Sequence, residues 1–347
     1  MERNLDVSVQ LSTYNRSEHL QQTLEAMCQL DRSGLTVEFV IVDNNSTDDT
    51  GQVIDSFANR LPLRHLFEAR QGQNYARNHA LDTAELGEIV AFTDDDVVPH
   101  RDWLQQIAAA CERWPEYDVF GGRLELIWPD GVAVPRWATE NDRIRRVGFV
   151  EYDLGAEPKP YERGRCPVGP NFWVRRSVFS RGARFDDSIG PRPGKQFGMG
   201  SEMEFLFRLA ADGIRPLYVP SAVVGHHVQV SLLDPRKMLE RAIRSGLGKP
   251  HIAGLPDPEQ LETNPWRWRM RRLVAIARNL LWRLRAELHR DECIRMRKAF
   301  EALRNYAYHR EALAMSWGTA KPVKLVETED GKSHGRMQGS EPKNPAR

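Results

Sequence analysis

The chain has 347 residues, of which 41% are hydrophobic and 28% are charged, so it can bury a substantial core and is not disordered as a whole. Its formal net charge is only +1, the excess of arginine is confined to residues 266–310, and we expect no nucleic-acid partner. The four cysteines are widely spaced and form no Cys-x-x-Cys pair, which argues against a zinc site or a disulfide framework.

The N-terminal region carries no sign of a targeting segment. Residues 1–6 lead directly into an apolar strand, which leaves no room for an apolar signal sequence. No apolar run in the sequence is long enough to span a bilayer. We therefore expect a cytoplasmic protein, either free or peripheral on the inner face of the membrane.

Strands alternate with helices through the first third of the chain. Short apolar runs predict strands at residues 7–11, 37–42, 63–67 and 89–92. Apolar residues at helical spacing follow each strand, within residues 20–27, 53–57, 76–80 and 103–111. This alternation predicts an α/β fold with a mainly parallel sheet that helices cover on both faces.

Polar clusters follow three of the predicted strands, at residues 12–15, 43–45 and 94–96. Ligands of open α/β sheets bind at the carboxyl ends of the strands, so these clusters predict a nucleotide site. No Gly-x-Gly-x-x-Gly fingerprint follows the first strand, and no Gly-Lys-Ser/Thr phosphate loop occurs. Dinucleotide-dependent oxidoreductases and P-loop enzymes are therefore disfavoured.

The cluster Asp94-Asp95-Asp96 closes a run short enough to be a buried strand. Carboxylates this close repel one another, and they are tolerated when they are hydrated or when a cation neutralises them. The pattern suggests a hard divalent metal ion. An alternative is that one of the three caps the helix that begins near Arg101.

The pattern becomes irregular after Gly122, with many Pro, Gly and Arg residues through Pro170, as expected for loops on an acceptor side. A Gly/Pro-rich loop at 190–200 then leads into an amphipathic helix that starts at Ser201. Residues 216–224 predict another strand, which ends at His226 and His227.

In their order, these motifs resemble the family 2 glycosyltransferases, which have the GT-A fold and use nucleotide sugars, over roughly residues 5–250. The matching segments are residues 12–16, 42–48, 76–78, 94–96, 169–172 with 175–176, 200–205 and 226–227. The resemblance implies a nucleotide-binding half at 1–122 and a catalytic and acceptor-binding half at 123–250.

The resemblance also implies roles for residues around the donor and the metal. Asp96 would bind a divalent ion, Mn²⁺ or Mg²⁺, together with His226, while His227 would point to the other face. Asp43 would read the base, although capping of the following helix is an equal alternative. The other residues expected along the nucleotide sugar are Thr13, Tyr14 (stacked on the base), Asn15, Arg16, Asn45, Arg77 (on the diphosphate), Asp94 and Asp95.

A carboxylate opposite the metal would take the proton of the acceptor hydroxyl, and Glu202 aligns with that catalytic base. The sequence departs from the family pattern here, because Ser201 replaces the usual first acid and Glu202 stands where Asp is commoner. Glu204 is the second candidate, with stabilisation of its own helix N-terminus as the alternative. Asn171 and Trp173 are expected on the acceptor side, and Trp173 fits the core equally well.

The C-terminal third is expected to be a basic helical appendage at 251–316, followed by a disordered tail at 317–347. Tryptophan and arginine flank an apolar stripe within 266–285, which suits an anionic membrane surface. The alternative is a helical hairpin that packs on the catalytic domain with a solvated basic face.

The leading hypothesis is a metal-dependent, inverting glycosyltransferase. It would move a sugar from a nucleoside-diphosphate sugar, most simply a UDP-sugar, to a saccharide or lipid-linked acceptor in cell-surface polysaccharide or glycolipid synthesis. The altered Ser201-Glu202 pair leaves open a catalytically silent nucleotide-sugar binding protein. A third hypothesis is an aspartyl-phosphate phosphohydrolase, because Asp94-x-Asp96 superficially fits that nucleophile motif.

Overall fold

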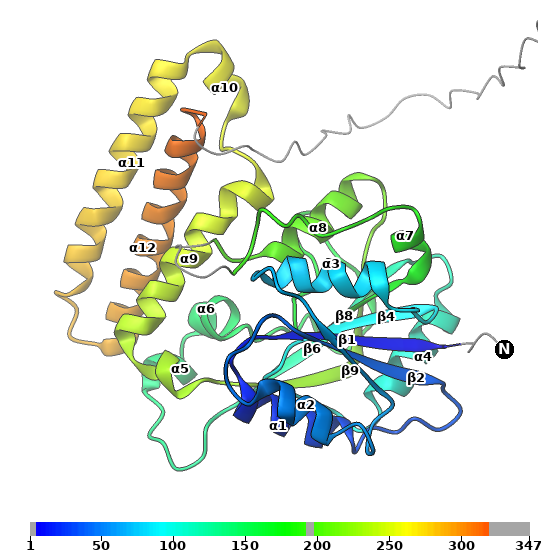
Figure 1. Cartoon of the computed structure of the whole chain (residues 1–347). Helices are drawn as coiled ribbons and strands as arrows, with labels where there is room; N and C mark the ends of the chain where they lie inside the picture. The colour runs from blue at the N-terminus through cyan, green and yellow to red at the C-terminus, as the bar shows by residue number, and fades with distance from the viewer. Residues whose placement is uncertain (1–4, 192–197, 319–347) are drawn as a thin grey trace, which may run out of the picture.

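The computed structural model describes residues 5–191 and 198–318. Most of its strands form one sheet in the order β3-β2-β1-β4-β8-β6-β9-β5, and β7 pairs with β9 (Figure 1). The strands are β1 (Val7–Thr13), β2 (Val37–Asp43), β3 (Leu63–Phe67), β4 (Ile89–Thr93), β5 (Val97–Pro99), β6 (Val119–Ile127), β7 (Lys159–Pro160), β8 (Phe172–Arg175) and β9 (Leu217–His227).

The strand directions divide the sheet into two halves. β3, β2, β1 and β4 are parallel, as the sequence predicted. β8 runs antiparallel between β4 and β6, and β5 and β7 run antiparallel to β9. Only β6 and β9 are parallel in the second half. The expectation of a mainly parallel sheet is therefore right for the first half alone, because long loops rather than βαβ crossovers precede β8.

Helices cover both faces of the sheet. The alternation along β4 shows this, because Ile89 and Ala91 face the core beneath α1, α2 and α4, whereas Val90 and Phe92 face the core beneath α8. Figure 1 shows α1 and α2 below the sheet and α3, α7 and α8 above it. These helices are α1 (Ser17–Met27), α2 (Thr50–Ser56), α3 (Gln73–Thr83), α4 (Trp103–Arg113), α7 (Arg176–Ser180) and α8 (Ser201–Ala211).

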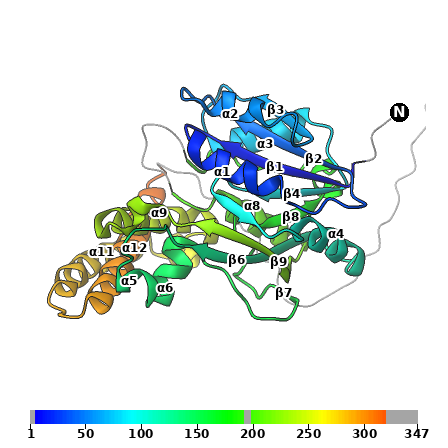
Figure 2. The same cartoon turned by 90° about the horizontal axis from the view of Figure 1, so that it is seen from below.

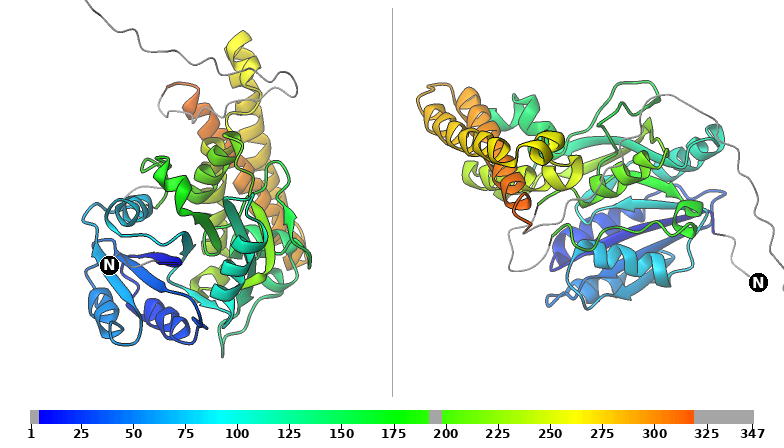
Figure 3. Two further views of the ribbon diagram at one scale, coloured as in Figure 1. Left: turned by 90° about the vertical axis from the view of Figure 1, so that its right-hand side faces the viewer. Right: turned by 90° about the horizontal axis from the view of Figure 1, so that it is seen from above.

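The C-terminal helices form a second layer beside the catalytic end of the sheet (Figures 2 and 3). They are α9 (Pro235–Ala253), α10 (Pro258–Thr263), α11 (Pro265–Ala286) and α12 (Glu292–Met315). α12 packs against both α9 and α11. A core around Phe149, Met238 and Phe300 joins α9 and α12 to α5 (Arg136–Thr139), α6 (Asp142–Ile144) and the single turns Arg145–Phe149 and Val230–Leu233.

The helical region thus begins at Pro235 and not at residue 251, because α9 runs on without interruption through Pro250. The predicted disordered tail falls almost wholly on residues 319–347, outside the described residues. None of the helices in the described part of the chain is both long and apolar enough to cross a membrane. All four cysteines are free thiols.

Candidate active site

A cavity of about 520 Å³ opens at the carboxyl ends of β1 and β4. Its wall is completed by the loop before α3, the first turn of α8, the end of β9 and one side of α9. The predicted site residues that line it are Thr13, Tyr14, Arg16, Asp94, Asp95, Asp96, Glu202 and His226. Segments more than two hundred residues apart therefore meet at one site, as the motif order implied.

Strand pairing brings the aspartates to His226. β5 follows the aspartate turn directly and pairs with the end of β9, where Val97 is the partner of His226. The backbone N–H of His227 also donates to the carbonyl of Asp96 at 2.9 Å. As a result, Nε2 of His226 lies 3.4 Å from Oδ1 of Asp96. His227 also borders the cavity. Adjacent residues of a strand point to opposite faces, so the expectation that its side chain points to the other face from His226 stays a prediction.

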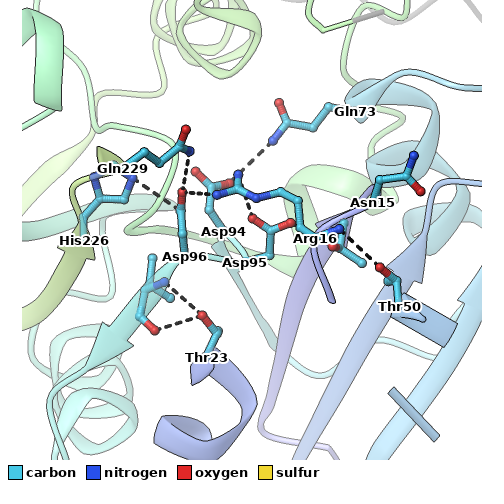
Figure 4. A network of polar contacts seen from close by, with 12 residues as sticks. Asn15, Arg16, Thr23, Thr50, Gln73, Asp94, Asp95, Asp96, His226 and Gln229 are labelled. Atoms are coloured by element: carbon cyan, nitrogen blue, oxygen red, sulfur yellow. Dashed lines mark hydrogen bonds and ion pairs between the residues drawn. The ribbon is translucent and has the colours of Figure 1, made fainter. Parts of the chain in front are cut away.

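Arg16 neutralises two of the aspartates (Figure 4). Its Nη2 lies 2.7 Å from Oδ2 of Asp96, and its Nη1 lies 3.1 Å from Oδ1 of Asp95. Thr13 donates its hydroxyl to Asp95 at 2.8 Å, and Gln229 donates its amide to Asp96 at 3.3 Å. The three carboxylates are thus tolerated because cationic and hydrogen-bonding groups surround them.

These surroundings make the three carboxyl groups unequal. Burial raises the pKa of Asp94 to about 6 and that of Asp95 to about 7, although Arg16 opposes the rise at Asp95. Burial acts on Asp96 in the same direction, but His226 and Arg16 outweigh it and hold the pKa of Asp96 well below its usual range. Asp96 is therefore the carboxylate that stays ionised throughout the neutral range.

Asp96 and His226 fit a divalent metal ion. Nδ1 of His226 lies 3.2 Å from the carbonyl of Phe149 and must donate to it, because a carbonyl oxygen only accepts. In the neutral ring this leaves a lone pair on Nε2 facing a carboxylate oxygen, which calls for a proton or a metal between them. No group of three or more His, Cys, Asp or Glu residues able to hold a metal occurs in the described ranges. Phosphate oxygens of a substrate and water would supply the remaining ligands.

Glu202 lines the cavity from the first turn of α8. Ser201 donates its hydroxyl to Oε2 of Glu202 at 2.9 Å, and Arg77 lies 3.7 Å from the same oxygen. A Cβ on Gly169 would stand 2.5 Å from Oε1, so a larger residue at position 169 would displace the Glu202 carboxylate from its present position. Ser201, the residue that replaces the usual first acid, thus orients the Glu202 carboxylate through its hydroxyl.

Several predicted donor residues lie behind the cavity wall. Arg77 is buried and hydrogen-bonds Asn74 and Ser201, with Asp94 at 4.0 Å. Asp43 is buried and accepts the N–H of Ser46, and Asn15 accepts that of Thr47. None of Arg77, Asp43, Asn15 or Asn45 belongs to the cavity lining among the described residues. They shape the loops that carry the lining residues.

Three assignments are corrected by burial. Glu204 is buried and ion-pairs with Arg208 at 2.9 Å, so it anchors its own helix instead of facing an acceptor. Asn171 is fully buried and receives the indole N–H of Trp103 at 3.0 Å. Trp173 is fully buried and stacks on Phe120, which is the core alternative considered above. Neither Asn171 nor Trp173 lines the acceptor side.

Ser12, Gln73, Gln229 and Arg241 are among the lining residues to which the sequence assigned no individual role, although Ser12 belongs to the polar cluster at 12–15. The hydroxyl of Ser12 is buried without a hydrogen-bond partner in the described structure, as expected of a group that meets a ligand. Gln229 lies three residues beyond His226 and could have been suspected from that spacing. No sequence signal marks Arg241, because its helix comes after the last motif.

The comparisons with known proteins agree with this arrangement. Residues 8–182, half of the chain, match the family model described as Glycosyl transferase family 2. The chain is a family 2 glycosyltransferase. Because the chain belongs to this family, the phosphohydrolase hypothesis is rejected, and the prediction that the protein is an enzyme is confirmed.

The glycosyltransferase is 28% identical to Glycosyltransferase AglE of Haloferax volcanii, over 55% of this chain and 68% of that one. It is 26% identical to Glucosyl-dolichyl phosphate glucuronosyltransferase of the same organism, over 64% of this chain and 69% of that one. Among solved structures, it resembles the mannosyltransferase PcManGT from Pyrobaculum calidifontis in complex with GDP-Man and Mn²⁺. The TM-score is 0.55 and the sequence identity is 20%, and the match covers 89% of this chain and 88% of PcManGT. These similarities confirm the predicted GT-A fold.

Proposed function

We propose that this glycosyltransferase is metal-dependent and inverting, and that it transfers a sugar from a UDP-sugar to an acceptor hydroxyl. The observation that carries the proposal is that Asp96, His226 and Glu202 line one cavity. They provide an anionic metal-binding group and a separate carboxylate for proton transfer. The likeness to PcManGT, whose structure contains GDP-Man and Mn²⁺, supports a nucleotide sugar as donor and a divalent metal as cofactor.

The donor would bind across the end of β1. Tyr14 is 40% exposed and lines the cavity, so its ring is available to stack on the base. The free hydroxyl of Ser12 beside it would hydrogen-bond the nucleoside. Asp94 would contact the sugar or ribose from the floor of the site.

Asp96 and His226 would hold the metal ion, with Arg16 fixing the second carboxylate oxygen of Asp96. When bound, Mn²⁺ or Mg²⁺ neutralises the negative charge that develops on the departing nucleoside diphosphate. Arg16 keeps the neighbouring Asp95 from repelling that diphosphate by pairing with its carboxylate. The positive charges of the metal ion and Arg16 would thus offset the negative charges of the aspartates and of the departing diphosphate.

Glu202 would act as the general base. Its carboxylate takes the proton of the acceptor hydroxyl while the oxygen forms a bond to the anomeric carbon. The bond from that carbon to the diphosphate breaks on the opposite face, and its electron pair leaves with the diphosphate. A single displacement of this kind inverts the anomeric configuration.

A lipid-linked acceptor is supported by the relative named for a glucosyl-dolichyl phosphate substrate. A saccharide acceptor in cell-surface polysaccharide or glycolipid synthesis uses the same chemistry. A lipid-linked acceptor would bring the enzyme to a membrane, and we propose that the basic residues 266–285 contact an anionic membrane surface.

The test pairs Asp96→Asn with Glu202→Gln. A screen of UDP-, GDP- and dTDP-sugars with and without Mn²⁺, read as thermal midpoints, first identifies the donor. Asp96→Asn should lose the Mn²⁺-dependent part of donor binding. Glu202→Gln should keep the donor Kd and lower kcat by about 10²–10⁴-fold, the usual contribution of a general base.

The control is Glu85→Gln, an exposed glutamate outside the cavity lining, which should change neither quantity. Wild-type protein that binds a donor without transferring or hydrolysing it would establish the catalytically silent alternative. Donor binding that Mn²⁺ does not affect would contradict the metal assignment.

A further inference from the structure

Helix α11 turns its apolar side away from the protein. It packs against α12 and α10 and forms the outer edge of the molecule in Figures 1 and 2. Its buried residues are Trp268, Arg272, Ala275, Asn279 and Ala286, a set poor in large apolar side chains. A surface helix normally buries its apolar stripe. In α11 that stripe lies opposite the packed side.

The exposed stripe has helical spacing. Trp266, Met270, Leu273, Leu280 and Leu284 follow one another at steps of three, four or seven residues, so they share one face. Trp266 is 72% exposed and Leu284 is 68% exposed. In the described chain, nine of the fifteen exposed large hydrophobic residues lie within residues 266–288. Such a concentration on one helix and the turn that follows it marks an interaction surface.

Arginines border this stripe. α11 contains seven arginines and no acidic residue. Arg267, Arg271, Arg278 and Arg285 recur along one flank, all exposed, and no carboxylate in the described ranges forms an ion pair with any of them. The first three line a cavity of about 440 Å³ together with Met270 and Val274. Positive charge and apolar surface thus meet at a hollow that is large enough to admit an anionic group.

We propose that α11 lies flat on an anionic lipid bilayer, with the stripe of Trp266, Leu273 and Leu280 in the boundary between headgroups and acyl chains. The flanking arginines then reach lipid phosphates, while their aliphatic stems cover the edge of the stripe. The hollow between Arg267, Arg271 and Arg278 receives one such phosphate. The opposite side of α11 remains packed on α12.

A second copy of the chain fits this surface less well. A twofold contact between antiparallel copies of α11 would place each arginine row against its own copy, because the same flank of both helices then meets itself. The described part of α11 offers no acid to relieve that repulsion. An anionic surface complements both the charge and the apolar stripe.

The first measurement is co-sedimentation of the full chain with vesicles, either of phosphatidylcholine alone or with one third phosphatidylglycerol. Wild type should bind the anionic vesicles at least tenfold more tightly, and added salt should weaken that binding. Leu273→Gln with Leu280→Gln, and separately Arg271→Gln with Arg278→Gln, should each lower the partition coefficient about tenfold or more. All four side chains are exposed, so folding is not at risk.

The matched control is Val132→Gln with Arg236→Gln, which changes an exposed apolar residue and an exposed arginine away from α11. It should bind vesicles like wild type. Brominated lipids report on position directly: they should quench the tryptophan fluorescence of wild type on binding, and Trp266→Phe should lose part of that quenching. A merely structural role for the stripe would not produce quenching.

Equal binding to neutral and anionic vesicles would overturn the proposal, as would unchanged binding of both double variants. A dimer in sedimentation equilibrium that Leu273→Gln with Leu280→Gln dissociates would also overturn it and identify a second copy as the occupant. The inference rests on the proposed function only in that a lipid-linked acceptor would explain why the enzyme binds a membrane. The vesicle assays contain no donor or acceptor, so failed sugar transfer and failed membrane binding are separate results.

Discussion

Arg241 is a lining residue to whose charge the proposed reaction assigns no role. It extends from α9 to the cavity wall, and its Nε is enclosed without a hydrogen-bond partner in the described structure. Burial, followed by the nearby charge of Arg244, lowers the pKa of Arg241 to about 10, so the side chain remains a cation at neutral pH. An enclosed cation with an unused donor is suited to a phosphate group.

Arg241→Gln should weaken binding of the preferred nucleoside diphosphate by about tenfold to a hundredfold, since hydrogen bonds to charged groups are worth about 1.5–3 kcal/mol. Binding of the corresponding free nucleoside should not change. Isothermal titration of both ligands measures the difference. Arg236→Gln, an exposed arginine on the same helix, is the control. Equal losses for nucleoside and diphosphate would indicate a damaged cavity and not a lost phosphate contact.

The position of a residue could be predicted from the sequence where that position depends on the residue's neighbours in the chain. Thr13, Asp96 and His226 stand at strand ends, and strand ends converge in an α/β sheet, so their place was predictable. Trp173 and Asn171 were misplaced because only the packing partners Phe120 and Trp103 reveal that they are core. A single sequence does not show such long-range contacts.

Two helices can approach closely only where small residues lie between them. The packing of α9 against its neighbours depends on two glycines, Gly246 and Gly248. A Cβ on Gly246 would stand 2.1 Å from the carbonyl of Arg304 in α12, and one on Gly248 would stand 1.8 Å from that of Met199. Both contacts are far shorter than real Cβ contacts, so α9 approaches its neighbours only because these side chains are absent.

Gly246→Ala should therefore destabilise the helical layer by about 1–3 kcal/mol, the usual cost of overpacking. Chemical denaturation measures the loss, and hydrogen exchange should become faster in α9 and α12 before it does in β1 and β4. Gly51→Ala in α2 is the matched control, because its Cβ would lie 3.8 Å from the nearest atom and alanine favours a helix. A stability of Gly246→Ala equal to wild type would mean that the two helices can separate without cost.

The first four strands and the helices between them were predictable because binary periodicity and turn residues agree there. The antiparallel β8, β5 and β7 were not, because their partners are chosen by long-range packing. The start of the helical layer at Pro235 was also missed, since only the short segment 228–234 lies between β9 and α9 and no long linker marks the boundary. These elements close the cavity, so the acceptor side was the least predictable part of the site.

At the scale of the molecule, the sheet and the helical layer differ in the charges they enclose. The sheet encloses aspartates that Arg16 and His226 balance. In the helical layer, cations gather around His309 of α12, whose Nδ1 is buried without a hydrogen-bond partner in the described structure. Burial and the charges of Arg272, Arg278 and Lys249 lower the pKa of His309 to about 4. The two layers should consequently respond differently to acid.

His309 should make the helical layer acid-sensitive. A histidine in the unfolded chain has a pKa near 6.5, so the unfolded state binds the proton first as the pH falls. The stability that neutral His309 contributes is complete above about pH 6.5 and is lost progressively as the pH falls toward 4. Carboxylates titrate in part of this window, so the comparison of wild type with His309→Gln isolates the histidine. Denaturation at pH 7.5, 6.0 and 5.0 should show a smaller acid loss in the variant, and equal losses in both proteins would show that His309 is protonated at no cost within the fold.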